Sequence, residues 1–319
     1  MSGAVLFSTV SKEEPSRIEP IADMNVPGME GAISICSLGG DELAVSLENG
    51  SVLLKIFNLD QKEKSRDLIM RGRGPDEFAA IGSIRMRRED DSSYMDFNVQ
   101  QPRLLIAIKI DNLEEIKKTD YLSFEEKGEY LFNTAYLTEG RILIRMSGAE
   151  PRYRLYDEAG QLLQEYVVFP GSTSYEEGVF NHYSLLKPDG SKMVLLMDYF
   201  DKLHIVDLDG SNHFSISTSE TIISDRTAIK RIILDGVSPV RYYVSSSVTD
   251  DYIYAQRYGY RQDSFRKQDY GTVIQKISWE GKLEKEYCIE EPLFSFTVDE
   301  AEGIMYGLTW DSRLQIFRL

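Results

Sequence analysis

The sequence is poor in cysteine, in histidine and in long apolar stretches. Its 319 residues include two cysteines, Cys36 and Cys288, and three histidines. Two cysteines are too few for a disulfide framework, so we expect both to be buried free thiols in strands. No stretch approaches the roughly 18 consecutive apolar residues of a membrane helix. The sequence therefore predicts neither a disulfide-stapled domain nor a transmembrane segment.

Positive charge is also scarce, because 36 Lys and Arg residues face 52 Asp and Glu residues, for a net charge of −16. Such a balance argues against broad binding of nucleic acid or anionic lipid, since phosphates would be repelled. The N-terminus reaches Lys12-Glu13-Glu14 before an apolar core could form, so no intact secretory signal is expected. We expect a monomer.

Motifs of several enzyme classes are missing. The sequence has no Gly-x-Ser-x-Gly elbow, no Walker loop, no His-Glu-x-x-His and no Cys-x-x-Cys. The histidines, His182, His204 and His213, are not at metal-ligand spacing. Asp207-Leu208-Asp209-Gly210 starts like a calcium loop but lacks its later ligands, so we interpret it as a hairpin turn.

What the sequence does contain is an internal repeat. A short acidic or Gly-containing turn followed by an apolar alternating strand recurs about every 52 residues, a spacing in the range of propeller blades. A second marker, an apolar strand that ends in an acidic or Gly turn, follows each first marker. The turns of the first marker are Asp41-Glu42, Asp90-Asp91, Glu139-Gly140, Asp189-Gly190, Asp250-Asp251 and Glu302-Gly303.

Each copy except the last supplies four strands, most plainly the fifth, with Arg241–Ser247, Tyr252–Arg257, Thr272–Trp279 and Lys282–Ile289. Four-stranded units repeated radially are the plan of a β-propeller, and no sustained helical period competes with it. We therefore predict an all-β, six-bladed β-propeller of four antiparallel strands per blade, as one domain over residues 1–319. The blades are expected at approximately 30–72, 78–125, 130–169, 180–218, 240–290 and 293–319.

The last copy ends at Leu319, directly after its third strand. An extra N-terminal strand within residues 4–24, either Ala4–Val10 or Arg17–Met24, precedes the first copy. Pairing it beside Leu314–Phe317 would complete the last blade and close the ring. The alternative is a disordered N-terminal tail.

The stretch Gly72-Arg73-Gly74-Pro75-Asp76-Glu77-Phe78, together with the six copies, resembles the bacterial TolB-like six-bladed β-propeller family. Members carry Gly-x-Gly-Pro-x-Glu-Phe/Tyr after the first blade, and the resemblance covers nearly the whole chain. It implies the propeller fold but no established activity. Because many members look exported or lipid-anchored, it also implies the cell envelope or periplasm, if a signal was removed.

This stretch also has a mechanical explanation as a crossing between blades. Gly72 and Gly74 permit positive φ, Pro75 fixes φ near −65°, and Phe78 is expected to start the next strand. The polar side chains of Arg71, Arg73, Asp76 and Glu77 could instead form a binding edge, with Glu77 alternatively satisfying loop amides.

Propeller connectivity sends the loops after strands one and three to one face, where acids dominate, and those after strands two and four to the other face. The second set holds arginines and aromatics, including the long insertion from Tyr258 to Tyr270. Such side chains dominate binding hot spots. We therefore predict a recognition protein without cofactor or catalysis that binds a protein, peptide or glycan. The candidate residues are Arg71, Arg73, Glu77, Tyr199, Arg241, Arg257, Tyr258, Tyr260, Arg261, Trp310 and Arg313.

The alternative is a calcium-dependent hydrolase or lactonase with carboxylates in the channel, so the sequence leaves enzymatic activity open. Asp198 and Asp201, which flank Tyr199 and Phe200, are the candidate calcium ligands. Solvated loop carboxylates are the ordinary interpretation of these two residues.

Overall fold

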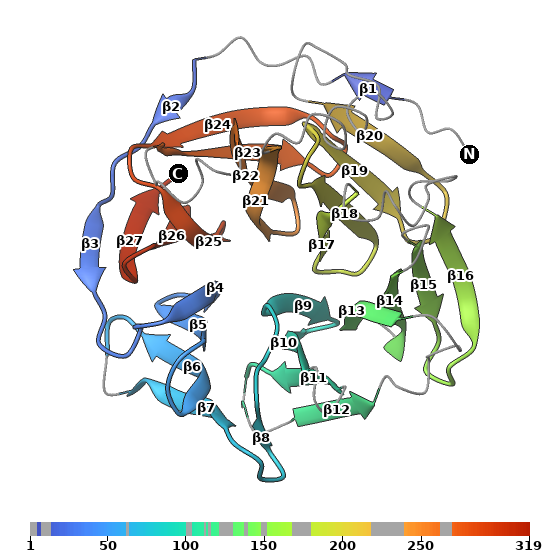
Figure 1. The fold of residues 1–319 in the computed structure, drawn as a ribbon, viewed down its shortest axis with the longest axis horizontal. Helices are drawn as coiled ribbons and strands as arrows, with labels where there is room; N and C mark the ends of the chain where they lie inside the picture. The colour runs from blue at the N-terminus through green and yellow to red at the C-terminus, as the bar shows by residue number, and fades with distance from the viewer. Residues whose placement is uncertain are drawn as a thin grey trace. The chain divides into compact units, whose positions relative to one another are not determined.

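The computed structural model of the chain describes residues 5–7, 14–61, 64–99, 104–111, 113, 116–120, 130–136, 140–147, 152–167, 180–217, 239–261 and 270–319. These residues form strands β1 to β27, arranged in six sheets, and they include no α-helix (Figure 1). Within this described part, no helix has the length and apolar character that crossing a membrane requires. The six sheets confirm the six copies predicted from the repeat.

The chain divides into two compact units. Unit 1 comprises Met1–Met24, Gly178–Trp310 and Leu314–Leu319, and unit 2 comprises Asn25–Glu177 and Asp311–Arg313. Each unit accounts for three of the sheets, apart from Asn25 and Arg313 at the ends of two strands of unit 1. The assignment of residues 1–319 to a single domain stays a prediction.

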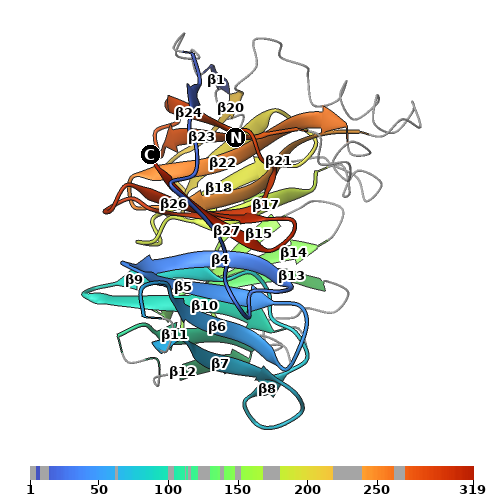
Figure 2. The same cartoon turned by 90° about the vertical axis from the view of Figure 1, so that its left-hand side faces the viewer.

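Unit 2 holds the first three sheets, in which neighbouring strands are antiparallel except for β7 and β8 (Figure 2). The first sheet is β4 (Ala32–Gly39), β5 (Glu42–Leu47), β6 (Val52–Asn58), β7 (Arg66–Arg71) and β8 (Glu77–Phe78). The second is β9 (Arg85–Glu89), β10 (Ser92–Val99), β11 (Leu104–Lys109) and β12 (Ile116–Asp120). The third is β13 (Tyr130–Tyr136), β14 (Ile142–Ser147), β15 (Arg152–Tyr156) and β16 (Leu162–Val167).

Unit 1 holds the other three sheets. The fourth is β17 (His182–Leu186), β18 (Lys192–Met197), β19 (Lys202–Asp207) and β20 (His213–Ser217), with β1 (Val5–Phe7) parallel to β20. The fifth is β21 (Val240–Val248), β22 (Tyr252–Arg261), β23 (Thr272–Ser278) and β24 (Leu283–Ile289), with β2 (Ser16–Arg17) parallel to β24. The sixth is β25 (Leu293–Asp299), β26 (Ile304–Thr309), β27 (Arg313–Arg318) and β3 (Ala22–Asn25).

Apolar residues pack successive sheets of a unit face to face. In unit 1, Val194 and Ile205 of the fourth sheet share a core with Ile253, Ile277 and Trp279 of the fifth. Alternation along the strands produces this arrangement, because every second side chain points to the same face of a sheet. The fifth copy accordingly matches its predicted strands closely, with β23 and β24 beginning or ending within a residue of the expected positions.

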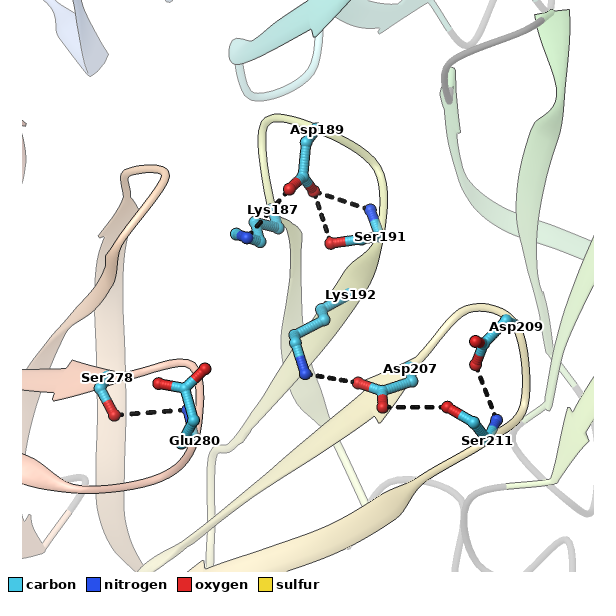
Figure 3. Close-up of polar contacts among 9 residues, drawn as sticks. All are labelled: Lys187, Asp189, Ser191, Lys192, Asp207, Asp209, Ser211, Ser278 and Glu280. Carbon is cyan, nitrogen blue, oxygen red and sulfur yellow. Dashed lines mark hydrogen bonds and ion pairs between the residues drawn. The ribbon is translucent and has the colours of Figure 1, made fainter.

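The hairpin turns explain why acids and glycines mark the repeat (Figure 3). Gly190, Gly210 and Gly281 have φ values of 69°, 78° and 88°, a region that L side chains rarely adopt. The preceding acids cap the same turns, since the Asp189 carboxylate accepts hydrogen bonds from the Ser191 amide (2.8 Å) and hydroxyl (2.6 Å). Asp207-Leu208-Asp209-Gly210 is thus a hairpin turn, as predicted.

The N-terminal segment lies along three sheets rather than one. The predicted completion of the last blade is confirmed, because β3 is the neighbour of β27 in the sixth sheet. The candidate strand Ala4–Val10 was wrong for this role, since β1 pairs with β20 instead. β1 and β2 add a fifth strand to the fourth and fifth sheets, and β8 adds one to the first, where four strands per blade were expected.

The motif after β7 differs from its prediction in two ways. Phe78 does not start the next blade: Glu77 and Phe78 form β8, which pairs with Met70 and Arg71 of β7, and Phe78 is buried. Neither Gly72 nor Gly74 has positive φ. Glycine at position 72 leaves room for the Glu77 side chain, because a Cβ there would clash with the Glu77 carboxylate in its present position.

The two cysteines are free, as predicted. Cys36 of β4 is buried, and burial raises the pKa of its thiol to about 12. Cys288 of β24 is only partly buried, so the expectation of full burial was wrong for this residue.

Candidate functional site

The candidate site lies in unit 1, where the loop after β18 meets β17 and β21. The loop is tied to both strands by its backbone: the Asp198 amide donates to the Asn181 carbonyl (3.0 Å), and the Tyr242 amide donates to the Asp198 carbonyl (2.7 Å). Asp198 to Asp201 are therefore held between the fourth and fifth sheets. The end of β22 adds Arg257, Tyr258 and Tyr260, since Tyr260 is the direct cross-strand partner of Arg241.

Asp198 and Arg241 form a buried ion pair. Arg241 donates from Nε to Asp198 Oδ1 (2.7 Å) and from Nη2 to Asp198 Oδ2 (3.1 Å), which is a two-point contact. The Asp198 side chain is 2% exposed and that of Arg241 is 17% exposed. Asn181 donates a further hydrogen bond to Asp198 (3.1 Å), and Arg241 also donates to the Tyr183 hydroxyl (2.9 Å).

A second pair lies beside the first. Arg257 of β22 donates from Nη2 to Asp201 Oδ2 (2.9 Å), and its Nε lies 3.4 Å from Asp201 Oδ1. The Tyr243 hydroxyl is 3.5 Å from the same carboxylate and 3.4 Å from Gln275. Asp201 is buried, and Arg257 is partly exposed.

The electrostatics of both pairs favour the charged arginines. Burial opposes the charge of Arg241, but its hydrogen bonds to Asp198 and Tyr183 and the charge interactions with the same two residues together raise the pKa of the guanidinium. Arg257 behaves in the same way, with Asp201 raising its pKa against the effect of burial. Each pair is therefore a compensated unit with no net charge.

Three tyrosines form an aromatic cluster at the end of β22. The Tyr260 and Tyr270 rings are stacked, with centroids 3.9 Å apart and planes at 16°. The Tyr258 ring meets both rings edge-on, at 5.2 Å from Tyr260 and 6.3 Å from Tyr270. Tyr260 remains 44% exposed. The cluster thus presents one braced ring to solvent.

Three more tyrosines surround the ion pairs. Burial raises the pKa of Tyr183, of Tyr199 and of Tyr242, so all three hydroxyls stay protonated at neutral pH. Tyr183 contacts Arg241, whereas Tyr199 and Tyr242 are influenced by the charges of Asp198 and Asp201 respectively. The site is therefore rich in neutral hydroxyl groups.

The structure brings together six of the predicted ligand-binding residues and both candidate calcium ligands. The ligand-binding residues are Tyr199, Arg241, Arg257, Tyr258, Tyr260 and Arg261, the last of which is exposed at the end of β22. The insertion between Arg261 and Tyr270 falls outside the described residues. Sequence reasoning treated the arginines and the aspartates as separate sets, but the fold pairs them.

Arg71, Arg73 and Glu77 belong to unit 2, where they contact their own loop and, through Arg71, the turn between β5 and β6. Arg71 donates to the backbone carbonyls of Gly50 (3.0 Å) and Ala79 (2.7 Å). Glu77 accepts hydrogen bonds from the amides of Arg73 (3.0 Å) and Gly74 (2.9 Å). These contacts match the interpretation of Glu77 as a cap for loop amides.

Two other candidates have local partners. Trp310 contacts Phe294 edge-on, with ring centroids 4.7 Å apart. Arg313 pairs with the exposed carboxylate of Asp311 at 2.9 Å.

The candidate calcium ligands each face an arginine. No group of three or more His, Cys, Asp or Glu side chains within the described residues is arranged to hold a metal ion. His204 and His213 do approach each other, with ring centroids 5.6 Å apart.

Sequence reasoning missed Asn181, Tyr183, Tyr243 and Gln275. Tyr183 and Tyr243 lie in β17 and β21, the first strands of their sheets, where an alternating pattern suggests core positions. A signal was present in Asn181 and His182, because two polar residues open a strand that is otherwise expected to be apolar.

Comparisons with known proteins identify the fold. The family described as TolB-like 6-blade propeller-like matches residues 39–301. A crystal structure of a DUF4221 family member from Bacteroides vulgatus is similar over 96% of this chain and 98% of that chain, at 15% identity and a TM-score of 0.61. Raptor from Chaetomium thermophilum is similar over 95% of this chain and 29% of that chain, at 10% identity and a TM-score of 0.52. No curated protein matches the sequence. The predicted six-bladed β-propeller is thereby confirmed.

Proposed function

Since the chain belongs to the TolB-like family of six-bladed β-propellers, we propose that it is a non-catalytic binding protein whose ligand contacts the tyrosine and arginine site of unit 1. The ligand is a protein, a peptide or a glycan. One observation carries the proposal: Tyr260 is held in place by Tyr258 and Tyr270 and is still 44% exposed. An aromatic ring that is ordered before binding loses little conformational entropy when a ligand covers it.

The surroundings support binding rather than proton transfer. Arg241 and Arg257 have raised pKa values, and so do Tyr183, Tyr199 and Tyr242. These groups keep their protons at neutral pH, whereas a general acid or base works best with a pKa near the working pH. The alternative of a calcium-dependent hydrolase or lactonase has less support, because Asp198 and Asp201 already pair with arginines.

Screening the protein against peptides, neutral glycans and acidic glycans tests the proposal. A ligand of this site should bind the wild type and lose affinity when Tyr260 and Arg261 are both changed to Ala. Leu163→Ala is the control, since Leu163 is 50% exposed on β16 in unit 2. A screen in which every ligand binds the Tyr260 and Arg261 double variant as well as the wild type would refute the proposal.

A further inference from the structure

We propose that the ligand of this site is a neutral glycan, which stacks a sugar ring on Tyr260. This inference rests on the proposed function and adds the chemical class of the ligand.

The tyrosine cluster has the geometry of a stacking platform. Tyr270 supports one face of the Tyr260 ring at 3.9 Å, and Tyr258 braces both rings from the edge. A sugar ring has an apolar face of C–H groups and a rim of hydroxyls. An aromatic side chain that is apolar on its face and polar at its tip matches both parts.

Neutral hydroxyl groups lie beside the platform. Arg241 is the cross-strand partner of Tyr260 and donates to the Tyr183 hydroxyl at 2.9 Å, so Tyr183 is connected to the platform through one residue. Tyr183 is 36% exposed. A phenol hydroxyl both donates and accepts hydrogen bonds, as sugar hydroxyls do. The partly buried Tyr199 follows Asp198 directly and adds a second such group.

The charges select against ionised ligands. An anionic ligand would compete with Asp198 and Asp201 for Arg241 and Arg257, at distances of 2.7 and 2.9 Å that are already optimal. It would also approach a protein of net charge −16. A cationic peptide would in turn find both carboxylates, Asp198 and Asp201, already neutralised by Arg241 and Arg257. A neutral ligand meets neither obstacle.

The experiment is affinity electrophoresis and calorimetry of the full chain with neutral polysaccharides, namely a mixed-linkage β-glucan, a galactomannan, a xyloglucan and dextran. Polygalacturonate is the acidic counterpart. We expect at least one neutral polysaccharide to bind the wild type and Leu163→Ala. Tyr260→Ala should weaken that binding at least about tenfold, as truncation of an aromatic hot spot does. Tyr260→Phe keeps the ring and should bind nearly as the wild type does.

The outcomes separate this inference from the proposed function. Binding of a peptide or of polygalacturonate that Tyr260→Ala abolishes would keep the site and overturn the neutral glycan. If none of the neutral polysaccharides binds the wild type, the neutral glycan is also overturned. Equal binding of a neutral polysaccharide to the wild type and to Tyr260→Ala would place the sugar elsewhere and overturn it too. Matching thermal melting curves of the variants would show that each is folded.

Discussion

Arg241 is the residue on which the arrangement of the site depends. It connects the loop after β18 to β17 and β21 through Asp198 and Tyr183. Removing one member of a buried ion pair leaves the other charge without compensation, which costs far more than losing a surface pair. The chain offers a comparison, because Arg313 and Asp311 are 2.9 Å apart, against 2.7 Å for Arg241 and Asp198, but the Asp311 side chain is 64% exposed.

We predict that Arg241→Met lowers the free energy of unfolding by about 3 kcal/mol, since Asp198 is left buried and charged. Arg313→Met should cost less than about 1 kcal/mol. Urea denaturation at neutral pH measures both values. Equal losses for the two variants would contradict the assignment of Arg241–Asp198 as a buried, stabilising contact.

His204 makes stability depend on pH. Burial, together with the nearby His213, Lys202 and His182, lowers the pKa of His204 from 6.5 to about 3. The unfolded chain therefore binds a proton at this residue between pH 6.5 and 3, and the folded chain does not. Stability is lost as pH falls through this window, because protons favour the state that binds them.

From pH 7 to pH 5 this effect amounts to about 2 kcal/mol, at about 1.4 kcal/mol for each unit below 6.5. His204→Phe keeps a ring but cannot titrate, so its unfolding free energy should fall by about 2 kcal/mol less than that of the wild type over the same interval. Denaturant titrations at both pH values provide the measurement. The same pH dependence in the two proteins would show that His204 is protonated in the folded state.

At the scale of elements, the sequence predicted strands well where turn chemistry and alternation agreed. Gly210 and Gly281 mark turns with positive φ, so the hairpins before β20 and β24 followed from local rules. The pairing of β1, β2 and β8 could not be predicted in this way. Each adds parallel to an outer strand, a contact that depends on which edge is available rather than on its own two or three residues.

β3 is the element that completes the sixth sheet. The Ile21 amide, directly before this strand, donates to the Ile316 carbonyl of β27 at 2.7 Å, and Gln315 donates to Asp23 at 3.0 Å. The Ile21 side chain itself is 60% exposed. The backbone amide of Ile21 therefore contributes more to holding β3 against β27 than its side chain does.

We predict that Ile21→Pro lowers the free energy of unfolding by about 1 to 3 kcal/mol, because proline has no amide hydrogen to donate and leaves the Ile316 carbonyl unsatisfied. Ile21→Ala keeps the amide and should lower the free energy of unfolding by only about 0.5 kcal/mol or less, as surface substitutions usually do. The comparison uses urea midpoints of the two variants. A proline variant as stable as the alanine variant would mean that β3 contributes little to the sheet.

At the scale of the whole molecule, two sequence markers at a common period were enough to give the number of blades, because each blade repeats the same turns. The candidate site was predicted only in part. Asp198 and Arg241 are 43 positions apart, and only the packing of the fourth sheet against the fifth brings them together. The sequence gives the charges of such residues but does not show that they pair and so compensate each other. The aspartates were therefore predicted as calcium ligands, in the alternative function, and the arginines as ligand-binding residues of a different site.

That compensation leads to the last prediction, on calcium. Ca²⁺ takes six to eight oxygen ligands, and an ion at Asp198 or Asp201 would have to displace Arg241 or Arg257 from contacts of 2.7 and 2.9 Å. A ligand present at 100 times its dissociation constant stabilises the folded state by about 2.7 kcal/mol. We therefore predict that millimolar calcium or EDTA leaves the melting temperature of the wild type unchanged, with magnesium as the control for ionic strength. Differential scanning calorimetry measures the shift. An increase specific to calcium, and lost in Asp198→Asn or Asp201→Asn, would establish the metal site and contradict this prediction.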